Sequence, residues 1–392
     1  MLTLRVLAAV ALTAPVLAIG SGPAAAVRLC QGEVVTIEAP ASGATVLGTE
    51  GPDVIDGIGR HHLTIDGRGG DDVICTGPGS GITARGGPGA DRIEGGGNET
   101  DNVLDGGPGD DVLRILGAGS LTGGDGDDRL VDANGPSYQR VTLVPGPGDD
   151  VVVGSGRRLS ELQFGGTAGV RISVPDGAAD GEGHDTFSGI GTFVGSAASD
   201  TFLGSPGADW FLGDAAMRPD SAPDVAYGAG GRDNLTMRGW AHGGTGADSI
   251  RIYGDRSTAK GGAGDDRIVA PSGSRCPTRV NCQGNVDGGS GRDRVTFGAS
   301  GGRGVRVDLS RRRARQGAYV TTVARVEDVI GTARADVLIG NTHDNTLRGG
   351  RGNDVLRGHR GADRLFGEGG RDRADGGTGA DRCVAEMTSS CR

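Results

Sequence analysis

The sequence predicts an all-β fold assembled from a short repeat, and three observations support this prediction. Glycine makes up 79 of the 392 residues, roughly three times its usual share of about 7%. Aromatic residues are only 3% of the chain, too few for a conventional globular core. Carboxylates recur every nine residues near the C-terminus, at Asp354, Asp363, Asp372 and Asp381. A glycine-rich chain could be disordered, but a fixed spacing indicates a repeat architecture.

The repeat has the form G-G-x-G-x-D-x-U-x, in which U is an apolar residue. Copies include GGPGADRIE from Gly86, GGPGDDVLR from Gly106 and GGRGNDVLR from Gly349. Glycine permits the positive φ angles and close backbone approaches of tight turns. The last three residues alternate between the faces of a short strand. The U side chains would therefore point inward and form a thin stacked core, and they are Ile93, Leu113, Leu130, Phe211, Leu235, Ile250, Ile268, Val295, Leu338, Leu356 and Leu365.

This nonapeptide resembles the RTX calcium-binding repeat, and the resemblance extends from about Gly48 to Val384. It implies a right-handed parallel β-roll or β-solenoid of Gly/Asp-rich nonapeptide repeats with interrupting loops. Two repeats would form one coil, with six residues of each repeat in a turn and three in a strand. The resemblance also implies that the aspartates at position 6 of the repeat bind Ca²⁺.

The spacing of the aspartates gives a physical reason for a cation. Residues 18 positions apart would lie on successive coils about 4.8 Å apart, so that Asp354 stacks near Asp372, and Asp363 near Asp381. Unpaired carboxylates at that distance repel one another, and Ca²⁺ with about 6–8 oxygen ligands would remove the repulsion better than octahedral Mg²⁺. The alternative is that these residues only stabilise turns by local hydrogen bonds. The predicted metal ligands are Asp71, Asp91, Asp111, Asp128, Asp150, Asp209, Asp233, Asp248, Asp266, Asp293, Asp336, Asp354, Asp363, Asp372 and Asp381.

Two ligand positions depart from the pattern. Asn345 keeps an oxygen but lacks the charge, and His62 lies nine residues from both Asp53 and Asp71. We expect weaker calcium binding at both places.

The charge balance bears on the partners of the protein. The formal net charge is −10, which argues against nucleic acid as the main partner and suits a cation. Arginine follows the ligand aspartate in many repeats, where its side chain would face outward. These arginines indicate either a solvated surface, the interpretation we prefer, or binding of anionic cell-surface polysaccharide, and they are Arg92, Arg129, Arg267, Arg294, Arg364, Arg373 and Arg382.

Residues 1–26 read as a signal peptide. Arg5 precedes an apolar run, and Ala24-Ala25-Ala26 forms a cleavage site of the A-x-A kind. The run is shorter than the roughly 20 apolar residues that span a membrane, and no second run follows. We therefore expect a secreted, extracellular protein without a membrane span.

Six cysteines suggest three disulfides in an exported chain, although free thiols are the alternative. Proximity in sequence favours the pairs Cys276–Cys282 and Cys383–Cys391, which leaves Cys30–Cys75.

The repeats are interrupted by two similar segments, GVRISVPDGAA from Gly169 and GVRVDLSRRRA from Gly304. Their alternating apolar residues predict strands. The expected organisation is a signal peptide at 1–26, an N-terminal repeat segment at 27–155, an insert with entry strands at 156–203, a middle repeat segment at 204–297, a second such insert at 298–335, and C-terminal repeats with a disulfide cap at 336–392.

No catalytic site is expected, because the repeats leave no room for a catalytic domain. No H-E-x-x-H motif is present, and GASGG around Ser300 matches a nucleophile elbow only by chance in so glycine-rich a chain. The sequence therefore predicts a secreted calcium-binding protein that needs Ca²⁺ to fold. The alternatives are a calcium-scaffolded cell-surface adhesin or polysaccharide-binding protein and, less favoured, a solenoid enzyme that modifies polysaccharide, with Asp176, Asp180, His184 and Tyr227 as loose candidates.

Overall fold

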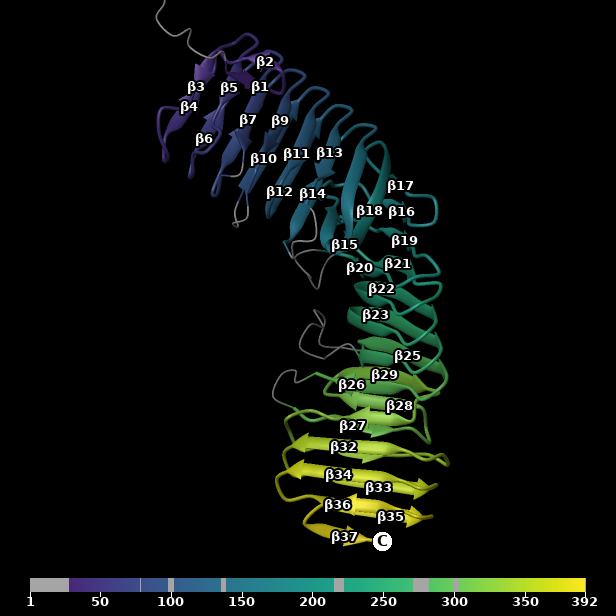
Figure 1. Ribbon diagram of the computed structural model, residues 1–392. Helices are drawn as coiled ribbons and strands as arrows, with labels where there is room; N and C mark the ends of the chain where they lie inside the picture. The colour runs from purple at the N-terminus through teal and green to yellow at the C-terminus, as the bar shows by residue number, and fades with distance from the viewer. Residues whose placement is uncertain are drawn as a thin grey trace, which may run out of the picture.

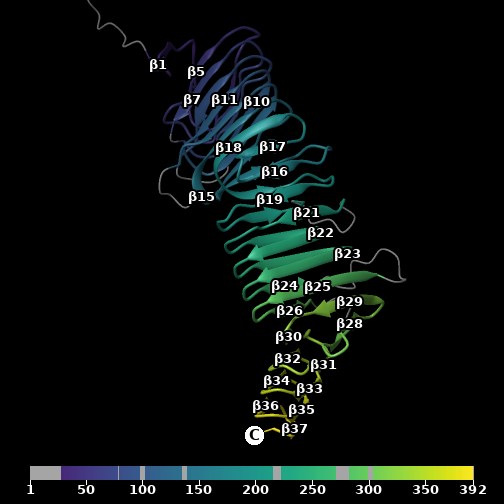
Figure 2. The ribbon, with the colours of Figure 1, turned by 90° about the vertical axis from the view of Figure 1, so that its right-hand side faces the viewer.

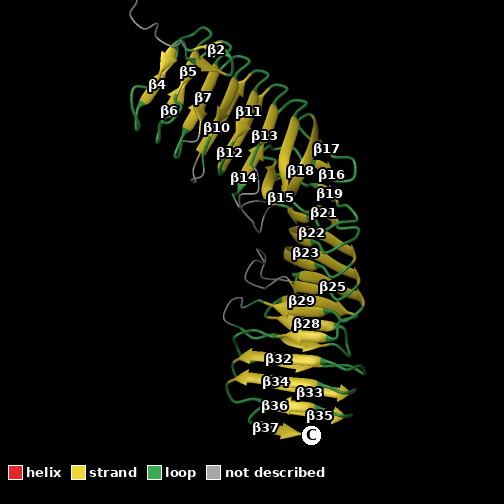
Figure 3. Cartoon of the chain, viewed as in Figure 1, coloured by secondary structure: helices red, strands yellow, loops and turns green. Residues whose placement is uncertain are grey.

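The protein is an extended, curved stack of short strands, with the first and last strands at opposite ends (Figure 1). The computed structural model describes residues 28–77, 79–97, 102–134, 139–214, 222–270, 282–298 and 303–391. Strands and loops account for all of these residues (Figure 3). In the described residues, no helix has the length and apolar character needed to cross a membrane.

The strands follow one another along the stack. The first part contains β1 (Leu29–Cys30), β2 (Glu33–Val34), β3 (Ile37–Glu38), β4 (Thr45–Leu47), β5 (Val54–Asp56), β6 (Thr64–Asp66), β7 (Val73–Gly77), β8 (Thr83–Arg85), β9 (Arg92–Gly95), β10 (Asn102–Pro108), β11 (Val112–Ile115), β12 (Gly119–Asp125), β13 (Arg129–Asp132), β14 (Val141–Val144) and β15 (Val151–Gln163). The middle part contains β16 (Arg171–Ser173), β17 (Ala178–Asp180), β18 (His184–Val194), β19 (Thr201–Leu203), β20 (Trp210–Leu212), β21 (Asp224–Tyr227), β22 (Asn234–Thr245), β23 (Ser249–Ala263), β24 (Arg267–Ala270), β25 (Gln283–Ser290) and β26 (Arg294–Phe297). The last part contains β27 (Arg306–Asp308), β28 (Arg313–Gln316), β29 (Tyr319–Ala324), β30 (Asp328–Ile330), β31 (Val337–Ile339), β32 (Thr346–Arg351), β33 (Val355–Arg360), β34 (Arg364–Gly369), β35 (Arg373–Thr378), β36 (Arg382–Val384) and β37 (Met387–Ser389).

Successive strands mostly alternate between two faces of the stack. Apart from β1, β2 and the two inserted hairpins, each strand pairs in parallel with the strand one coil further on. What we call the parallel face has only parallel pairings in the described residues, in the order β4, β6, β8, β10, β12, β14, β15, β18, β20, β22, β23, β24, β26, β30, β32, β34 and β36. The other face, which we call the hairpin face, begins with β3 and β5 and ends with β33, β35 and β37. The long strands β15, β18, β22 and β23 contribute to both faces. The predicted all-β parallel roll is confirmed.

The hairpin face owes its name to two inserted pairs of antiparallel strands. Strands β17 and β16 lie between β18 and β19, and strands β28 and β27 lie between β29 and β31. These hairpins contain the two similar segments from Gly169 and Gly304, and both segments form strands as expected. The hairpins fall within 156–203 and 298–335, but the division of the chain into segments stays a prediction. The predicted signal peptide at 1–26 lies outside the described residues.

The core is a row of inward side chains from each face. Ile74, Ile93 and Leu113 occupy successive positions on the hairpin face, and Leu347 and Leu365 do so on the parallel face; all are fully buried. Each coil contributes little apolar area, so the core grows only by stacking. All the predicted U residues are buried.

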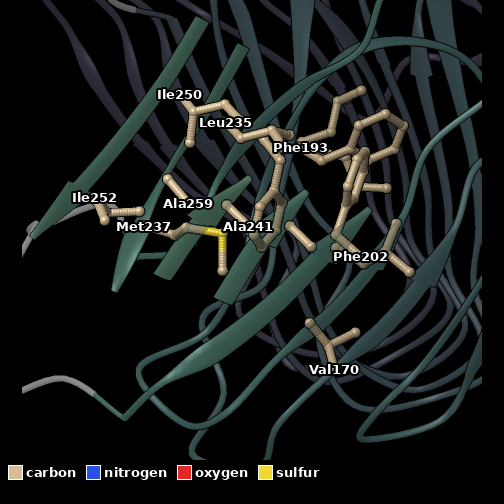
Figure 4. Close-up of a cluster of buried hydrophobic side chains, with 14 of the residues drawn as sticks. Val170, Phe193, Phe202, Leu235, Met237, Ala241, Ile250, Ile252 and Ala259 are labelled. Atoms are coloured by element: carbon tan, nitrogen blue, oxygen red, sulfur yellow. The ribbon is translucent and has the colours of Figure 1, made fainter. Parts of the chain in front are cut away.

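Phenylalanines fill the core where the first hairpin enters. The rings of Phe202 and Phe211 are stacked with centroids 4.7 Å apart, and Phe193 lies 5.6 Å from Phe202. Val170 and Leu235 extend this cluster (Figure 4). Large side chains suit this place because the hairpin changes the pairing of the strands.

Two disulfides attach the ends of the chain to the stack. Cys30 lies on β1, which pairs antiparallel with β2, and it is disulfide-bonded to Cys75 on β7. Cys383 is disulfide-bonded to Cys391. Both pairings match the sequence prediction. Cys282 is disulfide-bonded, and its expected partner Cys276 lies outside the described residues.

Candidate metal centre

Buried aspartates form rows along the stack, one residue per coil. In each row, Oδ1 of an aspartate accepts the backbone N–H of the aspartate one coil earlier. Asp354 N–H, for example, donates to Asp372 Oδ1 at 2.9 Å, and Asp363 N–H donates to Asp381 Oδ1 at 2.9 Å. The predicted stacking of these pairs is therefore present, and a hydrogen bond links each pair.

The same bond recurs from one end of the molecule to the other. The rows are Asp53, Asp72, Asp91, Asp111, Asp128, Asp150 and Asp185; then Val170, Asp200 and Asp224; then Asp209, Asp233, Asp248, Asp266 and Asp293; then Val305, Asp336, Asp354 and Asp372; and then Asn345, Asp363 and Asp381.

The second carboxylate oxygen, Oδ2, has no partner in most of these residues. It is buried and accepts no hydrogen bond in Asp72, Asp91, Asp111, Asp128, Asp150, Asp200, Asp233, Asp248, Asp266, Asp293, Asp354, Asp363, Asp372 and Asp381. Buried polar atoms almost always have partners, and an isolated buried carboxylate is especially unfavourable. So regular a set of unpartnered oxygens indicates that a bound group belongs beside them.

The backbone of the turn explains why Oδ2 is free. In every one of these turns except that of Asp200, the residue four positions before the aspartate has a positive φ, such as 108° at Gly87 and 107° at Gly350. Its N–H donates elsewhere; that of Gly87 donates to the carbonyl of Gly106 on the next coil. We call a turn of this kind, with an unpartnered Oδ2, an open turn.

Four turns are built differently. The residue four positions before the row residue is Thr49, Ser205, Thr332 or Asn341, and none of these has a positive φ. Their N–H groups donate to the row side chain in the same turn, at 2.5–2.8 Å, to Asp53 Oδ2, Asp209 Oδ2, Asp336 Oδ2 and Asn345 Oδ1. We call these closed turns.

The two glycines of the repeat are required for different reasons. A side chain at Gly86, the first glycine, would collide with Oδ2 of Asp91. Gly87, the second, takes the left-handed φ that L side chains avoid. In four open turns a residue other than glycine stands at this second position and still has a positive φ. These residues are Arg68 (78°), Ala229 (73°), His359 (82°) and Glu368 (74°). Strain of about 1–2 kcal/mol at such residues is consistent with a functional role.

Burial makes these carboxylates hard to ionise when no cation is bound. Desolvation raises the pKa of Asp111 to about 8, that of Asp72 and of Asp128 to about 7, and that of Asp354 to about 6. Neighbouring aspartates in the row add to the increase, and the N–H donated to Oδ1 opposes it. In the closed turn, burial also raises the pKa of Asp336, but the hydrogen bonds from Thr332 oppose the rise.

Fourteen of the fifteen predicted ligands lie in these rows and are buried, which leaves one to correct. Asp71 is exposed, and the next residue, Asp72, takes the place in the row. Asp71 instead belongs to an outer row, in which Oδ1 accepts the N–H of the following coil; its donor is Ala90, at 2.9 Å. The same bond links Asp110 to the N–H of Asp127.

The sequence prediction missed Asp53, Asp72, Asp185, Asp200 and Asp224. No good copy of the repeat precedes them, because the turns of Asp53, Asp185, Asp200 and Asp224 lack the double glycine and that of Asp72 has Gly69-Gly70 directly before two aspartates. A weaker signal was available, since each stands two residues before an inward apolar residue, as Asp200 does before Phe202.

Glutamates end two of the rows. Glu327 Oε2 accepts the N–H of Asp293 at 2.9 Å, and Glu386 Oε2 accepts the N–H of Asp372 at 2.7 Å. Where no further aspartate follows in the row, a glutamate carboxylate thus accepts the hydrogen bond that the next aspartate would accept.

The residues considered for a solenoid enzyme do not form a common hydrogen-bonded set. His184 Nδ1 lies 2.6 Å from Asp180 Oδ1, and Asp176 accepts a hydrogen bond from Ser173. Tyr227 packs against Trp240 on another part of the hairpin face. Ser300 lies outside the described residues.

The donor set of the open turns suits calcium. Within the described part of the chain, no three His, Cys, Asp or Glu side chains come together as a metal cluster, so a metal with mainly side-chain ligands does not fit. Ca²⁺ accepts backbone carbonyls together with carboxylates and tolerates irregular geometry. Each open turn supplies one unpartnered carboxylate oxygen beside glycine-rich backbone.

Comparison with known proteins agrees with this donor chemistry. The family model of the RTX calcium-binding nonapeptide repeat matches residues 64–82, 83–113, 185–216, 325–356 and 348–383. No curated protein matches the chain.

Proposed function

Because this chain carries repeats of the RTX calcium-binding family, we propose that it binds Ca²⁺ at its open turns and needs Ca²⁺ to fold. The observation that carries the proposal is the set of buried, unpartnered Oδ2 atoms along the rows. Without a cation these oxygens leave buried charge uncompensated or force the carboxyl groups to take up protons. The proposed role is therefore binding and structural rather than catalytic.

In this proposal, the carboxylates and the turn carbonyls of the chain would hold the ions. The open turns of Asp72, Asp91, Asp111, Asp128 and Asp150 follow one another in a single row, so their sites would be coupled. Ca²⁺ supplies the positive charge that lets neighbouring carboxylates ionise together. Extracellular calcium modules commonly bind at about 10⁻⁴–10⁻³ M, and we expect affinities of that order.

We further propose that the protein works outside the cell. The disulfides Cys30–Cys75 and Cys383–Cys391 suit an oxidising compartment. The chain would then fold only after its export, when it meets the calcium-rich medium outside the cell.

The test is far-UV circular dichroism of the EDTA-stripped protein during titration with CaCl₂, with MgCl₂ in parallel. We expect a cooperative gain of β structure with Ca²⁺ only. A β spectrum that is complete in EDTA and unchanged by Ca²⁺ would refute the dependence of folding on calcium.

Equilibrium dialysis with ⁴⁵Ca²⁺ separates binding from folding. If the stripped protein is already folded but still takes up calcium at about 10⁻⁴–10⁻³ M, the binding part of the proposal survives. If no calcium is bound at millimolar concentration, both parts fail.

A further inference from the structure

One region of this acidic protein carries a concentrated positive charge. It lies on the hairpin face, on β28, β27, β31, β33 and β35, which follow one another in that order in the sheet. Figure 2 shows β28, β31, β33 and β35 along one side of the lower half of the molecule. Its exposed arginines are Arg306, Arg311, Arg313, Arg315, Arg357, Arg360 and Arg373, and we call this set the arginine face.

The surface is hollowed at two places along the arginine face. A hollow of about 230 Å³ is lined by Arg306, Asp308, Arg311, Arg313 and Arg315. A second, of about 510 Å³, is lined by residues that include Arg357, His359, Arg360, Arg373 and Asp375. Only β31 separates β27 from β33, so the hollows are neighbours along the axis of the stack.

Few ion pairs compensate these arginines, although Asp375 is the cross-strand partner of Arg357. Asp308 lies 3.6 Å from Arg311, and no other arginine of the face has a carboxylate within 4 Å among the described residues. Arg306 and Arg315 are direct cross-strand partners, and like charges in such positions destabilise a sheet. An anion between them would remove the repulsion.

The first hairpin of the same molecule shows the neutral alternative. Its strands β16 and β17 have the same arrangement, but Arg171 there faces Asp180, where Arg306 faces Arg315 in the second hairpin. Ala178 likewise takes the position that Arg313 takes opposite Asp308. The positive charge is therefore a property of one hairpin, and the fold does not demand it.

We propose that the arginine face binds an acidic polysaccharide that lies along the axis of the stack. Guanidinium groups form paired hydrogen bonds with carboxylate, sulfate or phosphate groups. Successive strands are about 4.8 Å apart, which is close to the length of one sugar ring. An acidic polysaccharide along the axis can therefore reach Arg306 and Arg315 on the hairpin and, beyond β31, which carries no arginine, Arg357 and Arg373. No Phe, Tyr or Trp side chain lines either hollow, whereas proteins that bind single-stranded nucleic acids stack the bases on such side chains.

The proposal is tested by the affinity of the purified protein for hyaluronan, a carboxylate polymer that calcium does not gel. Isothermal titration at low and at physiological salt, with calcium present, would compare it with dextran sulfate, neutral dextran and oligodeoxythymidine. We expect hyaluronan or dextran sulfate to bind, which identifies the acidic group, while neutral dextran does not. Failure of both acidic polymers to bind, or tighter binding of oligodeoxythymidine, would overturn the proposal.

Variants on the two faces provide the matched control. Arg357→Gln with Arg373→Gln should weaken binding about tenfold or more, because two charged hydrogen bonds to the polymer are lost. Arg364→Gln with Arg382→Gln changes the net charge equally on the parallel face of the same coils and should change the affinity less than about twofold. Equal weakening by both pairs would show a response to net charge alone and contradict the proposal.

Arg315→Asp guards against a folding artefact. It gives the second hairpin the cross-strand pair of the first, so the fold should be kept or stabilised while binding falls. Unchanged binding by a folded Arg315→Asp variant would contradict the role of the hairpin. Polysaccharide binding depends on arginines, whereas the proposed calcium sites depend on aspartates. If the protein proves to fold without calcium, this test therefore remains valid.

Discussion

Asp336 and Asp354 stand next to each other in one row, yet they lie in turns of opposite character. Asp336 N–H donates to Asp354 Oδ1 at 2.8 Å, so the two residues are directly hydrogen-bonded. In the closed turn, Thr332 donates both its N–H and its hydroxyl to the carboxylate of Asp336. In the open turn, Gly350 takes a φ of 107° and Oδ2 of Asp354 has no partner.

The comparison shows what the backbone conformation four residues before the aspartate decides. Either the N–H there donates to the aspartate side chain within the turn, or Oδ2 is left without a partner. Both turns keep the aspartate buried and in register. A closed turn satisfies its carboxylate within the protein, as Asp209 is satisfied by Ser205. Under the proposed function, an open turn leaves that task to a cation, and the following predictions test this division.

The largest effect should follow removal of calcium. A site held at 100 times its dissociation constant stabilises the fold by about 2.7 kcal/mol, and the contributions of coupled sites add. Residues 86–150, with successive open turns, should lose amide protection in EDTA before residues 303–347, which contain the closed turns of Asp336 and Asn345. Hydrogen exchange with mass spectrometry would measure this, and simultaneous loss in both regions would argue against the division.

Asp354→Asn should have opposite effects with and without calcium. It removes a buried charge, so the metal-free protein should gain stability, whereas the calcium-loaded protein should lose about 1–3 kcal/mol. The folded fraction in EDTA, measured by far-UV circular dichroism, and the Tm in CaCl₂ give the two signs. Asp336→Asn is the control, and we expect it to leave the calcium stoichiometry unchanged; a loss of one bound ion from this variant would count against the closed turn as a calcium-free site.

Acid should stabilise the metal-free protein. The folded pKa values of Asp72, Asp111 and Asp128 are raised to about 7 or 8 from an ordinary value near 3.8. The folded state therefore binds more protons, and this contribution is fully present below pH 3.8 and is lost as the pH rises through the folded pKa values. A tenfold difference in proton affinity between the folded and the unfolded chain corresponds to about 1.4 kcal/mol.

Far-UV circular dichroism in EDTA should thus show more β structure at pH 5 than at pH 8, because protons then neutralise the buried carboxylates in place of calcium. Calcium affinity should show the reverse trend and weaken as the pH falls from 8 to 6, because protons compete for the same oxygens. A gain of β structure in EDTA between pH 5 and pH 8 would contradict the buried, uncompensated state of the rows.

The smallest effect should come from Thr332→Ala. The variant loses the hydroxyl hydrogen bond to Asp336 but keeps the N–H bond, so it should cost about 1 kcal/mol. The loss should be the same at every calcium concentration at which the protein is folded. A loss that appears only with calcium present would indicate that this turn also holds an ion.

Much of the fold could be predicted because one residue type repeats at one spacing. The inward residues, such as Leu356 and Leu365, follow directly from the unit G-G-x-G-x-D-x-U-x. The choice between Asp71 and Asp72 could not be made from the glycines, since both residues follow Gly69-Gly70. The core decides it, because Ile74 must point inward and the row residue stands two positions earlier.

Other parts of the site carry no repeat signal. Asp200 and Asp224 follow turns without a double glycine, so only their distance from Phe202 and Ala226 marks them. The division into open and closed turns depends on the φ of one residue, and Arg68, which takes a positive φ, is not a glycine. Glu327 and Glu386 reach the ends of rows from loops, where no spacing rule applies.

The glutamate at the end of the row from Val305 to Asp372 also determines where that row stops. An unpaired backbone group at the end of a stack can pair with another chain. Glu386 occupies the N–H of Asp372, the group to which a further aspartate of this row would have to bond. One carboxylate from the chain itself therefore closes this row within the molecule.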